Sequence, residues 1–212
     1  MILQPSSFRL RCLSLVGLGI ALVGLTWRLP RILAVYLSSN RLRPKWREAL
    51  WLAVTEVNGC RFCSYIHEGM AGAAGLSPED IQALVATGEG ARPAGLSERE
   101  SVAVAYAKVW AETAGEPPSG LVDQVGRDLT QREVADLHAL IYTINFANRA
   151  GNTVDSALHR LRHPRRLLAL WGTLNDFAVG GLVALFGWPA LLTGAILRWR
   201  TRKRDKHNGE RY

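Results

Sequence analysis

Helix start signals recur through the middle of this 212-residue chain, and they constrain its fold more than any other feature. Ser97 and Glu100 form a capping box ahead of one apolar run of helical spacing, and Thr130 and Glu133 form a second box ahead of another. The sequence Ser-Pro-Glu-Asp at 77–80 is a third start signal, with a cap residue, a proline at the first helical position and acids in the first turn. Strand signals are weak, so we predict an all-α fold of about six helices joined by short polar turns.

An apolar segment is found at each end of the chain. Residues 12–27 carry no charge, but about 16 residues give only ~24 Å of helix, which is short for a bilayer span. Because no small-residue cleavage site follows, we expect a membrane anchor or an interfacial helix there rather than a signal peptide, with a buried core helix as the alternative. Residues 177–197 would form ~31 Å of uncharged helix, which matches a hydrocarbon core and predicts a membrane-seated helix. The alternative for this second segment is a core helix or a buried oligomer contact.

The formal charge of +8 is concentrated at the two ends of the chain. Residues 1–27 carry two basic residues and no acidic one, and residues 198–212 carry seven basic and two acidic ones, whereas residues 28–176 carry 17 basic and 16 acidic ones. Positive charge beside apolar segments suits anionic lipid headgroups, so membrane lipids are expected partners. No nucleic-acid-binding motif is present, and nucleic acid is not an expected partner. We expect a membrane-associated protein whose central domain lies in the cytoplasm, although the positive-inside count does not fix the orientation.

The stretch from Glu48 to His67 carries the residues best suited to chemistry. Residues three apart on a helix have Cβ atoms ~5–6 Å apart, so Cys60 and Cys63 can close a disulfide with little backbone movement. His67 lies one turn beyond Cys63 on the same face, where an imidazole can take the thiol proton and stabilise the thiolate. Glu48, in the preceding helix, could reach His67 and set its tautomer. The pattern therefore predicts a redox-active dithiol with a proton-transfer pair.

Two helices are expected around this motif. The first covers residues 45–57 and ends at Asn58 and Gly59, and the second covers residues 60–74. Asn58 or Gly59 can serve as the N-cap of the second helix. The unpaired N–H groups and the positive dipole end of its first turn would then lower the pKa of Cys60.

Other interpretations of these residues remain open on the sequence alone. The two cysteines can be small core residues, or they can bind zinc, for which the nearest candidate fourth ligand is His138. Spacing alone favours Glu48 as a solvated or ion-paired helix residue near Lys45 and Arg47. His67 can be a structural histidine, although its distance from the second cysteine favours a functional role.

The spacing Glu48-x11-Cys60-x-x-Cys63-x-x-x-His67 resembles the signature of the AhpD-like, carboxymuconolactone decarboxylase superfamily. The sequence INFANR at 144–149 is similar to the closing helix of that family, which often carries an Asn-Arg pair. The resemblance covers roughly residues 40–155, and the apolar segments at the two ends lie outside it.

The resemblance implies an all-helical, usually oligomeric protein that acts as a thiol-dependent peroxidase or a disulfide reductase. By position, Cys63 would be the thiolate that attacks peroxide, Cys60 the resolving thiol, and His67 and Glu48 the proton relay. The substrate would be a hydroperoxide and the reductant an external dithiol, such as a lipoyl group or a thioredoxin-like protein, with no cofactor and no metal. Phe62 stands where well-studied members carry a histidine, so part of the relay is missing or replaced. The decarboxylase branch generally lacks the C-x-x-C pair, which argues against decarboxylation.

These observations divide the chain into three parts. Residues 1–31 form an N-terminal anchor or interfacial helix, residues 32–159 an AhpD-like redox domain that opens with a connection at 32–43, and residues 160–212 a basic linker, a transmembrane-like helix and a basic tail. We expect a membrane-associated, homo-oligomeric, alkylhydroperoxidase-like oxidoreductase. The alternatives are a non-catalytic redox sensor or assembly module in the membrane, and a dithiol–disulfide reductase.

Overall fold

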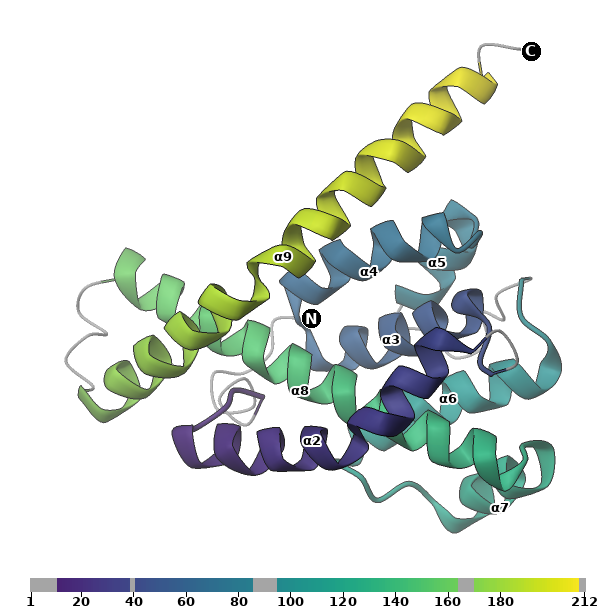
Figure 1. Cartoon of the computed structure of the whole chain (residues 1–212), viewed down its shortest axis with the longest axis horizontal. Helices are drawn as coiled ribbons and strands as arrows, with labels where there is room; N and C mark the ends of the chain where they lie inside the picture. The colour runs from purple at the N-terminus through teal and green to yellow at the C-terminus, as the bar shows by residue number, and fades with distance from the viewer. Residues whose placement is uncertain (1–10, 39–40, 86–94, 164–169, 210–212) are drawn as a thin grey trace.

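The computed structural model describes residues 11–38, 41–85, 95–163 and 170–209. Within these ranges it has eight helices and no strand, which confirms the all-α prediction. The helices are α2 (Leu15–Leu37), α3 (Pro44–Asn58), α4 (Arg61–Ala73), α5 (Pro78–Val85), α6 (Glu98–Glu112), α7 (Ser119–Asp128), α8 (Gln131–Arg162) and α9 (Leu170–Gly209). Figure 1 shows the long helix α8 running through the middle of the assembly, with the other helices arranged around it.

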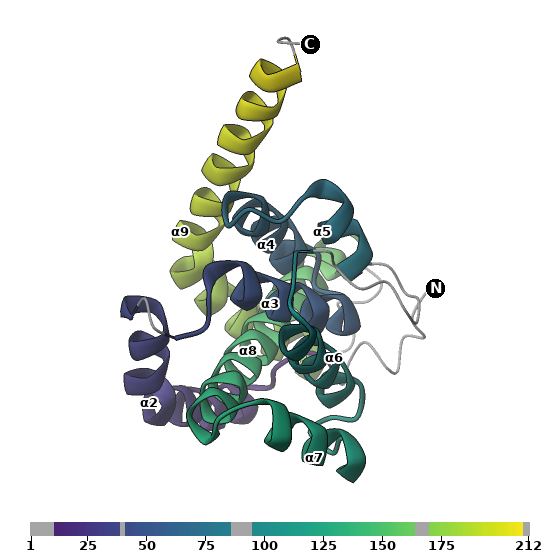
Figure 2. The same cartoon turned by 90° about the vertical axis from the view of Figure 1, so that its right-hand side faces the viewer.

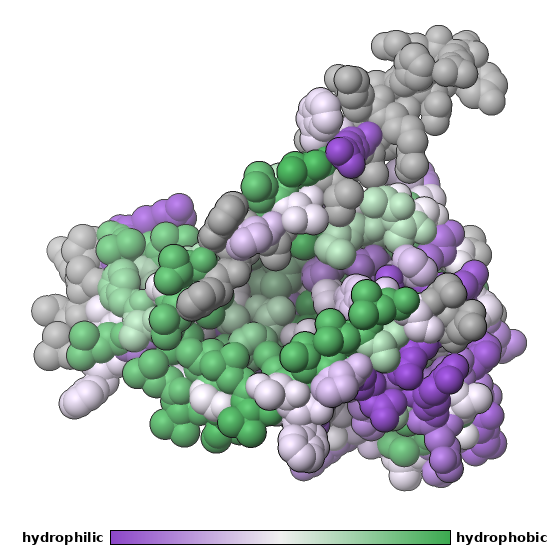
Figure 3. All heavy atoms as spheres, in the orientation of Figure 1, coloured by the Kyte–Doolittle hydropathy of each residue, from purple (hydrophilic) through white to green (hydrophobic). Residues whose placement is uncertain are grey.

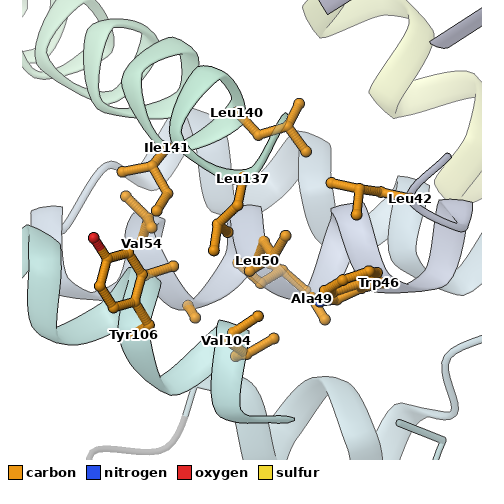
Figure 4. Close-up of a cluster of buried hydrophobic side chains, with 14 of the residues drawn as sticks. Leu42, Trp46, Ala49, Leu50, Val54, Val104, Tyr106, Leu137, Leu140 and Ile141 are labelled. Carbon is orange, nitrogen blue, oxygen red and sulfur yellow. The ribbon is translucent and has the colours of Figure 1, made fainter. Parts of the chain in front are cut away.

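The hydrophobic core lies between α3, α6 and α8. Its members come from successive turns of each helix, as helical spacing of apolar residues requires. Figure 4 labels side chains that meet there, including Leu50, Val54, Val104, Leu137 and Ile141. The core therefore fixes α3, which precedes the cysteine motif, against the long helix α8.

The local signals in the sequence account for most helix ends. The capping boxes of Ser97 and Thr130 are both formed, at the starts of α6 and α8. Helix α3 ends where Gly59 adopts the left-handed conformation, with φ of 64°, which a residue without Cβ adopts at little cost. The expected ends of the helices around the motif are therefore confirmed to within a residue or two.

Helix α2 is longer than the sequence suggested. The expected connection at 32–43 is wrong in its first part, because residues 32–37 continue the helix through Pro30. Figures 1 and 2 show α2 bending part-way along, as a proline inside a helix allows. The boundary expected at residue 31 thus falls inside one continuous helix.

Helix α9 packs on α4 and α8 and then extends away from the rest of the molecule (Figures 1 and 2). It contains the apolar segment 177–197 and continues without interruption into the basic tail. That segment is thus helical, and its seating in a membrane stays a prediction. The boundary expected at residue 160 lies within α8, which runs to Arg162.

Large apolar side chains are exposed mainly on α2 and α9. Figure 3 shows green side chains gathered over these two helices on one face of the molecule. Among the described residues, α2 is the one helix long and apolar enough to cross a membrane by length and composition, and only 6% of its most apolar window is buried. Most of α2 therefore presents apolar surface without covering from the described part of the chain.

Candidate active site

The cysteine pair lies at the corner between α3 and α4. Cys60 is itself the N-cap of α4, so the expectation that Asn58 or Gly59 caps this helix is wrong. The Sγ atoms of Cys60 and Cys63 are 2.9 Å apart, and the backbone N–H of Cys63 donates to the sulfur of Cys60 at 3.4 Å. Both thiols are free and buried. The two sulfurs are therefore placed to share one proton or to join as a disulfide.

The surroundings of the two thiols separate their pKa values. The S–H of Cys63 donates to the sulfur of Cys60 and lowers the pKa of Cys60, and backbone N–H groups of the first helical turn lower it further against the opposing effect of burial. The pKa of Cys63 is raised, because it holds the shared proton and is buried. In the reduced protein the first thiolate is therefore centred on Cys60.

His67, one turn beyond Cys63 on α4, meets Glu48 of α3. The Nδ1 atom of His67 lies 2.8 Å from Oε2 of Glu48, and both side chains are buried. The interpretation of Glu48 as a residue that is solvated or ion-paired near Lys45 and Arg47 is thus wrong. A carboxylate at Nδ1 fixes the tautomer that carries a proton there, which leaves Nε2 as the nitrogen that can accept one. The spacing along α4 puts this imidazole on the same face as Cys63, one turn further on.

An aromatic ring closes one side of this acid–histidine pair. The rings of His67 and Trp51 pack edge to face, with centroids 4.6 Å apart and planes 86° apart, and the ring of Tyr36 of α2 also packs on Trp51 with centroids 6.1 Å apart. The indole N–H of Trp51 is buried and has no hydrogen-bond partner among the described residues. The pair is therefore shielded from water by an apolar surface that still carries one unused donor.

Helix α8 approaches the dithiol closely at a glycine. A Cβ atom placed on Gly151 would lie 2.6 Å from Sγ of Cys60 and 3.6 Å from Sγ of Cys63, so no larger residue fits without moving a sulfur. One residue later, Nδ2 of Asn152 donates to the carbonyl oxygen of Asn58 at 3.0 Å. Helix α8 thus both makes room for the sulfurs and holds the backbone just before them.

Residues 27–109 match the family model described as Carboxymuconolactone decarboxylase family. The chain is therefore similar to that family over this segment. The matched range contains Glu48, both cysteines and His67, whereas Gly151 lies beyond it. A comparison with curated proteins found no match. Members of the carboxymuconolactone decarboxylase family are enzymes, either decarboxylases or peroxidases, and the family includes alkylhydroperoxidases.

Further asparagines of α8, which lie outside the matched range, form hydrogen bonds to α3 inside it. Asn145 accepts from Nδ2 of Asn58 at 2.9 Å, and Asn148 accepts from the hydroxyl of Thr55 at 3.0 Å. Arg149, the other member of the Asn-Arg pair seen in the sequence, donates to a backbone oxygen of the segment before α2 at 3.2 Å. Asn145, Asn148 and Asn152 recur every three to four residues along α8, and that spacing was the signal that could have identified them.

The segment that precedes α2 is tied to the same corner. The backbone N–H of Leu13 donates to Oγ1 of Thr153 at 2.8 Å, and the guanidinium of Arg11 contacts the carbonyl oxygen of Val57. Asn175 of α9 donates to the carbonyl oxygen of Leu13 at 3.0 Å. The two apolar helices and the cysteine corner are thus joined through one short stretch of backbone.

The zinc interpretation receives no support from the geometry. His138 lies in α8, where Nε2 is 2.9 Å from the hydroxyl of Tyr106 and the two rings are stacked. Among the described residues, no group of three or more His, Cys, Asp or Glu side chains is placed to hold a metal ion. The structure brings Cys60 together with Cys63 and, as a second pair, His67 together with Glu48. Gly151, beside the sulfurs, and Trp51, beside His67, are the neighbours that the sequence did not single out.

Proposed function

We propose that this protein is a thiol-dependent peroxidase that reduces hydroperoxides through a dithiol–disulfide cycle of Cys60 and Cys63. The observation that supports it most is the 2.9 Å separation of the two sulfurs, one helical turn from a histidine held by a buried carboxylate. The match of residues 27–109 to a family that includes alkylhydroperoxidases is consistent with this chemistry.

The cycle has three steps. A thiolate attacks the terminal oxygen of the hydroperoxide, the O–O bond breaks, and the alkoxide leaves as an alcohol after taking one proton, so that the cysteine becomes a sulfenic acid. The second thiol then displaces water from the sulfenic acid and forms the Cys60–Cys63 disulfide. An external dithiol, such as a lipoyl group or a thioredoxin-like protein, reduces the disulfide by thiol–disulfide exchange and is itself oxidised.

We assign the attack to Cys63 and the resolving step to Cys60. Two observations bear on this choice and point in different directions. The lower pKa belongs to Cys60, but Cys60 is completely buried, whereas Cys63 is 6% exposed. An electrophile must touch the sulfur it oxidises, and a proton shared over 2.9 Å can move to Cys60 as Cys63 reacts. Access therefore decides the assignment.

His67 and Glu48 form the proton relay in this proposal. With Nδ1 held by Glu48, the free Nε2 can take the thiol proton and return it to the leaving alkoxide. The charge of Glu48 stabilises the imidazolium that forms in between. Phe62 occupies the place between the cysteines where a histidine would otherwise assist, so we assign the whole relay to this one pair.

We further propose that the protein works at a membrane. The exposed apolar surface of α2 supports this location, and it would bring lipid hydroperoxides close to the cysteine corner. The short stretch of backbone that joins the start of α2 to Thr153 and Val57 keeps the site next to that surface.

Single-turnover mass spectrometry of the purified full-length protein tests the proposal. Reduced protein treated with one equivalent of an organic hydroperoxide should form the Cys60–Cys63 disulfide, and a dithiol should restore both thiols. Cys60→Ser should accumulate a sulfenic acid on Cys63, Cys63→Ser should not react, and Cys12→Ser should behave as the parent. Turnover by Cys63→Ser equal to that of the parent would end the proposal.

The same geometry leaves a second candidate, a redox sensor without turnover. The burial of both sulfurs favours it, because a sensor needs only slow and reversible oxidation. It predicts that the disulfide forms but that peroxide consumption stops after one equivalent in the presence of excess dithiol. Steady-state peroxide consumption separates the two candidates.

A further inference from the structure

A pocket far from the cysteines lies between α2 and the first turns of α8. Its volume is about 550 Å³, within the range of small-molecule sites. Its lining includes three arginines and several uncharged residues, among them Arg31, Arg41, Arg132, Trp27, Pro30 and Ala135. Ala135 lies 16 residues before the glycine that contacts the thiols, which is about 24 Å along the helix axis. The proposed peroxidase site therefore does not use this pocket.

The pocket has more positive than negative charge. Arg31 and Arg41 both donate to the same oxygen of Asp136, at 3.1 and 2.7 Å, and the side chain of Asp136 is only 1% exposed. The carboxylate of Asp136 therefore pairs with two of the three lining arginines, and the third, Arg132, makes no hydrogen bond or ion pair with any residue that the structure describes. Each guanidinium carries five N–H donors, so one contact to Asp136 leaves donors available on Arg31 and Arg41.

This excess favours an anion with several oxygen atoms. Planar guanidinium groups bind phosphate through paired hydrogen bonds, which makes arginine the usual residue for phosphate recognition. Arg31 remains 43% exposed at its side chain, so a ligand from outside can reach it without breaking the ion pair to Asp136.

The rim of the pocket belongs to the apolar helix. Trp27 is 87% exposed, and Leu29 and Leu33 of α2 are also exposed beside the lining residues Pro30 and Arg31. An indole beside basic residues at the end of an apolar stretch is the arrangement found where proteins meet the headgroup level of a bilayer. A ligand that fills the pocket therefore has a charged group inside and an apolar part next to α2.

We propose that this pocket binds the phosphate of an anionic phospholipid headgroup, with the acyl chains lying along α2. Arg132 supplies the uncompensated charge, Arg31 and Arg41 supply further donors while Asp136 holds them in place, and Trp27 sits at the level of the glycerol backbone. The proposal does not depend on peroxidase activity, because none of these residues lies at the cysteine corner.

The test measures lipid binding by the full-length chain in zwitterionic detergent micelles. Short-chain phosphatidylglycerol, short-chain phosphatidylcholine, glycerol 3-phosphate and inorganic phosphate are titrated separately, with calorimetry as the measurement. We expect phosphatidylglycerol to bind at least about tenfold more tightly than the other three. Arg132→Gln should weaken that binding by about tenfold, the effect of losing one charge-assisted hydrogen bond.

Two further variants make the test specific to the pocket. Arg127→Gln removes an exposed charge on α7 outside the lining and should leave the affinity unchanged. Ala135→Phe keeps every charge but fills the pocket, and it should weaken binding as much as Arg132→Gln does.

Three results would overturn the proposal. Equal affinity for phosphatidylglycerol and phosphatidylcholine would show that charge does not matter. Equal affinity for inorganic phosphate and the lipid would assign the pocket to a free anion. A loss in Arg127→Gln as large as that in Arg132→Gln would show diffuse surface attraction in place of a site.

Discussion

The two ends of α8 contact very different environments. Near Gly151 the helix lies against two buried thiols and holds the backbone before them through asparagine side chains. Near Arg132 it borders an open pocket lined by three arginines, two of which share the carboxylate of Asp136. The first end holds reactive groups in fixed positions, as chemistry on a small substrate requires. The second leaves hydrogen-bond donors available, as ligand binding requires. One rigid helix can thus carry two sites with opposite demands on packing.

The largest effect is expected on disulfide formation, from a substitution that fills the space between α8 and the two thiols. Gly151→Ala places a methyl group 2.6 Å from the sulfur of Cys60, so the sulfur must move and the thiol–thiol hydrogen bond must break. Because disulfide formation needs a narrow geometry, we expect the single-turnover rate of disulfide formation to fall by at least about 100-fold. Gly126→Ala, on α7 in open space, is the matched control and should react as the parent does. A parental rate in Gly151→Ala would show that the close approach has no part in the chemistry.

The second largest effect is expected on protein stability, from a substitution at the pocket end of α8. Asp136→Asn removes the buried charge that holds two arginines, and loss of a buried ion pair costs ~3–5 kcal/mol. Because both arginines keep access to water, we expect about 3 kcal/mol and a fall in Tm of roughly 6–12 °C. The same variant should bind phosphatidylglycerol more tightly, since the pocket loses its one compensating charge. Thermal unfolding and lipid titration measure the two changes, with Asp128→Asn at the exposed end of α7 as control.

A smaller effect, on peroxide turnover, is expected from a substitution of Glu48, the partner of His67. Glu48→Gln keeps the shape of the side chain but removes the charge that stabilises a protonated His67. Partners that orient a catalytic group typically contribute about 10- to 100-fold, and we expect peroxide turnover to fall by that factor while the disulfide can still form. Glu56→Gln, about two turns further along α3 and without contact to His67, serves as the control. Equal turnover in both variants would leave Glu48 with a purely structural role.

Much of the fold followed from local signals in the sequence. Capping boxes, a proline at the start of α5 and a left-handed glycine after α3 act over one turn of helix, so they can be identified without knowing the tertiary structure. The extent of α2 could not be predicted in this way. Its continuation past Pro30 is held by Arg31, whose partner Asp136 lies 105 residues away. Ion pairs between distant elements leave no local pattern.

The candidate site was predicted only in part for the same reason. Cysteines and a histidine at spacings of three and four residues share a helix face, and the structure keeps them within one helix and its cap. The contact between Glu48 and His67 depends on how α3 packs against α4, and spacing alone favoured a solvated Glu48. Gly151 reads in the sequence as an ordinary small residue, because only the approach of another helix gives it a role.

The least disruptive way to examine the dithiol end is to vary the pH. The structure gives Cys60 a lowered pKa and Cys63 a raised one, whereas unfolded cysteines titrate near 8.5. As the pH rises through the folded pKa of Cys60, the native state binds one proton fewer than the unfolded state, so stability increases. Above about 8.5 the unfolded state has lost both protons while native Cys63 keeps its own, so stability decreases again.

The stability contributed by the reduced pair should therefore pass through a maximum near pH 8.5, with slopes of at most about 1.4 kcal/mol per pH unit on either side. Two proteins are compared: Cys12→Ser, which keeps the pair, and the triple variant in which Cys60 and Cys63 are serine as well. The difference in their free energies of unfolding, measured with denaturant under reducing conditions from about pH 6 to about pH 10, isolates this contribution. If the difference in free energy of unfolding between the two proteins does not change with pH, the two thiols titrate in the folded state as they do in the unfolded state. The charged residues at the proposed lipid pocket are three arginines and the neighbouring buried Asp136, and none of them contacts the thiols. Arg132→Gln should therefore leave the pH of maximum stability unchanged, so this measurement reports on the dithiol end of α8 alone.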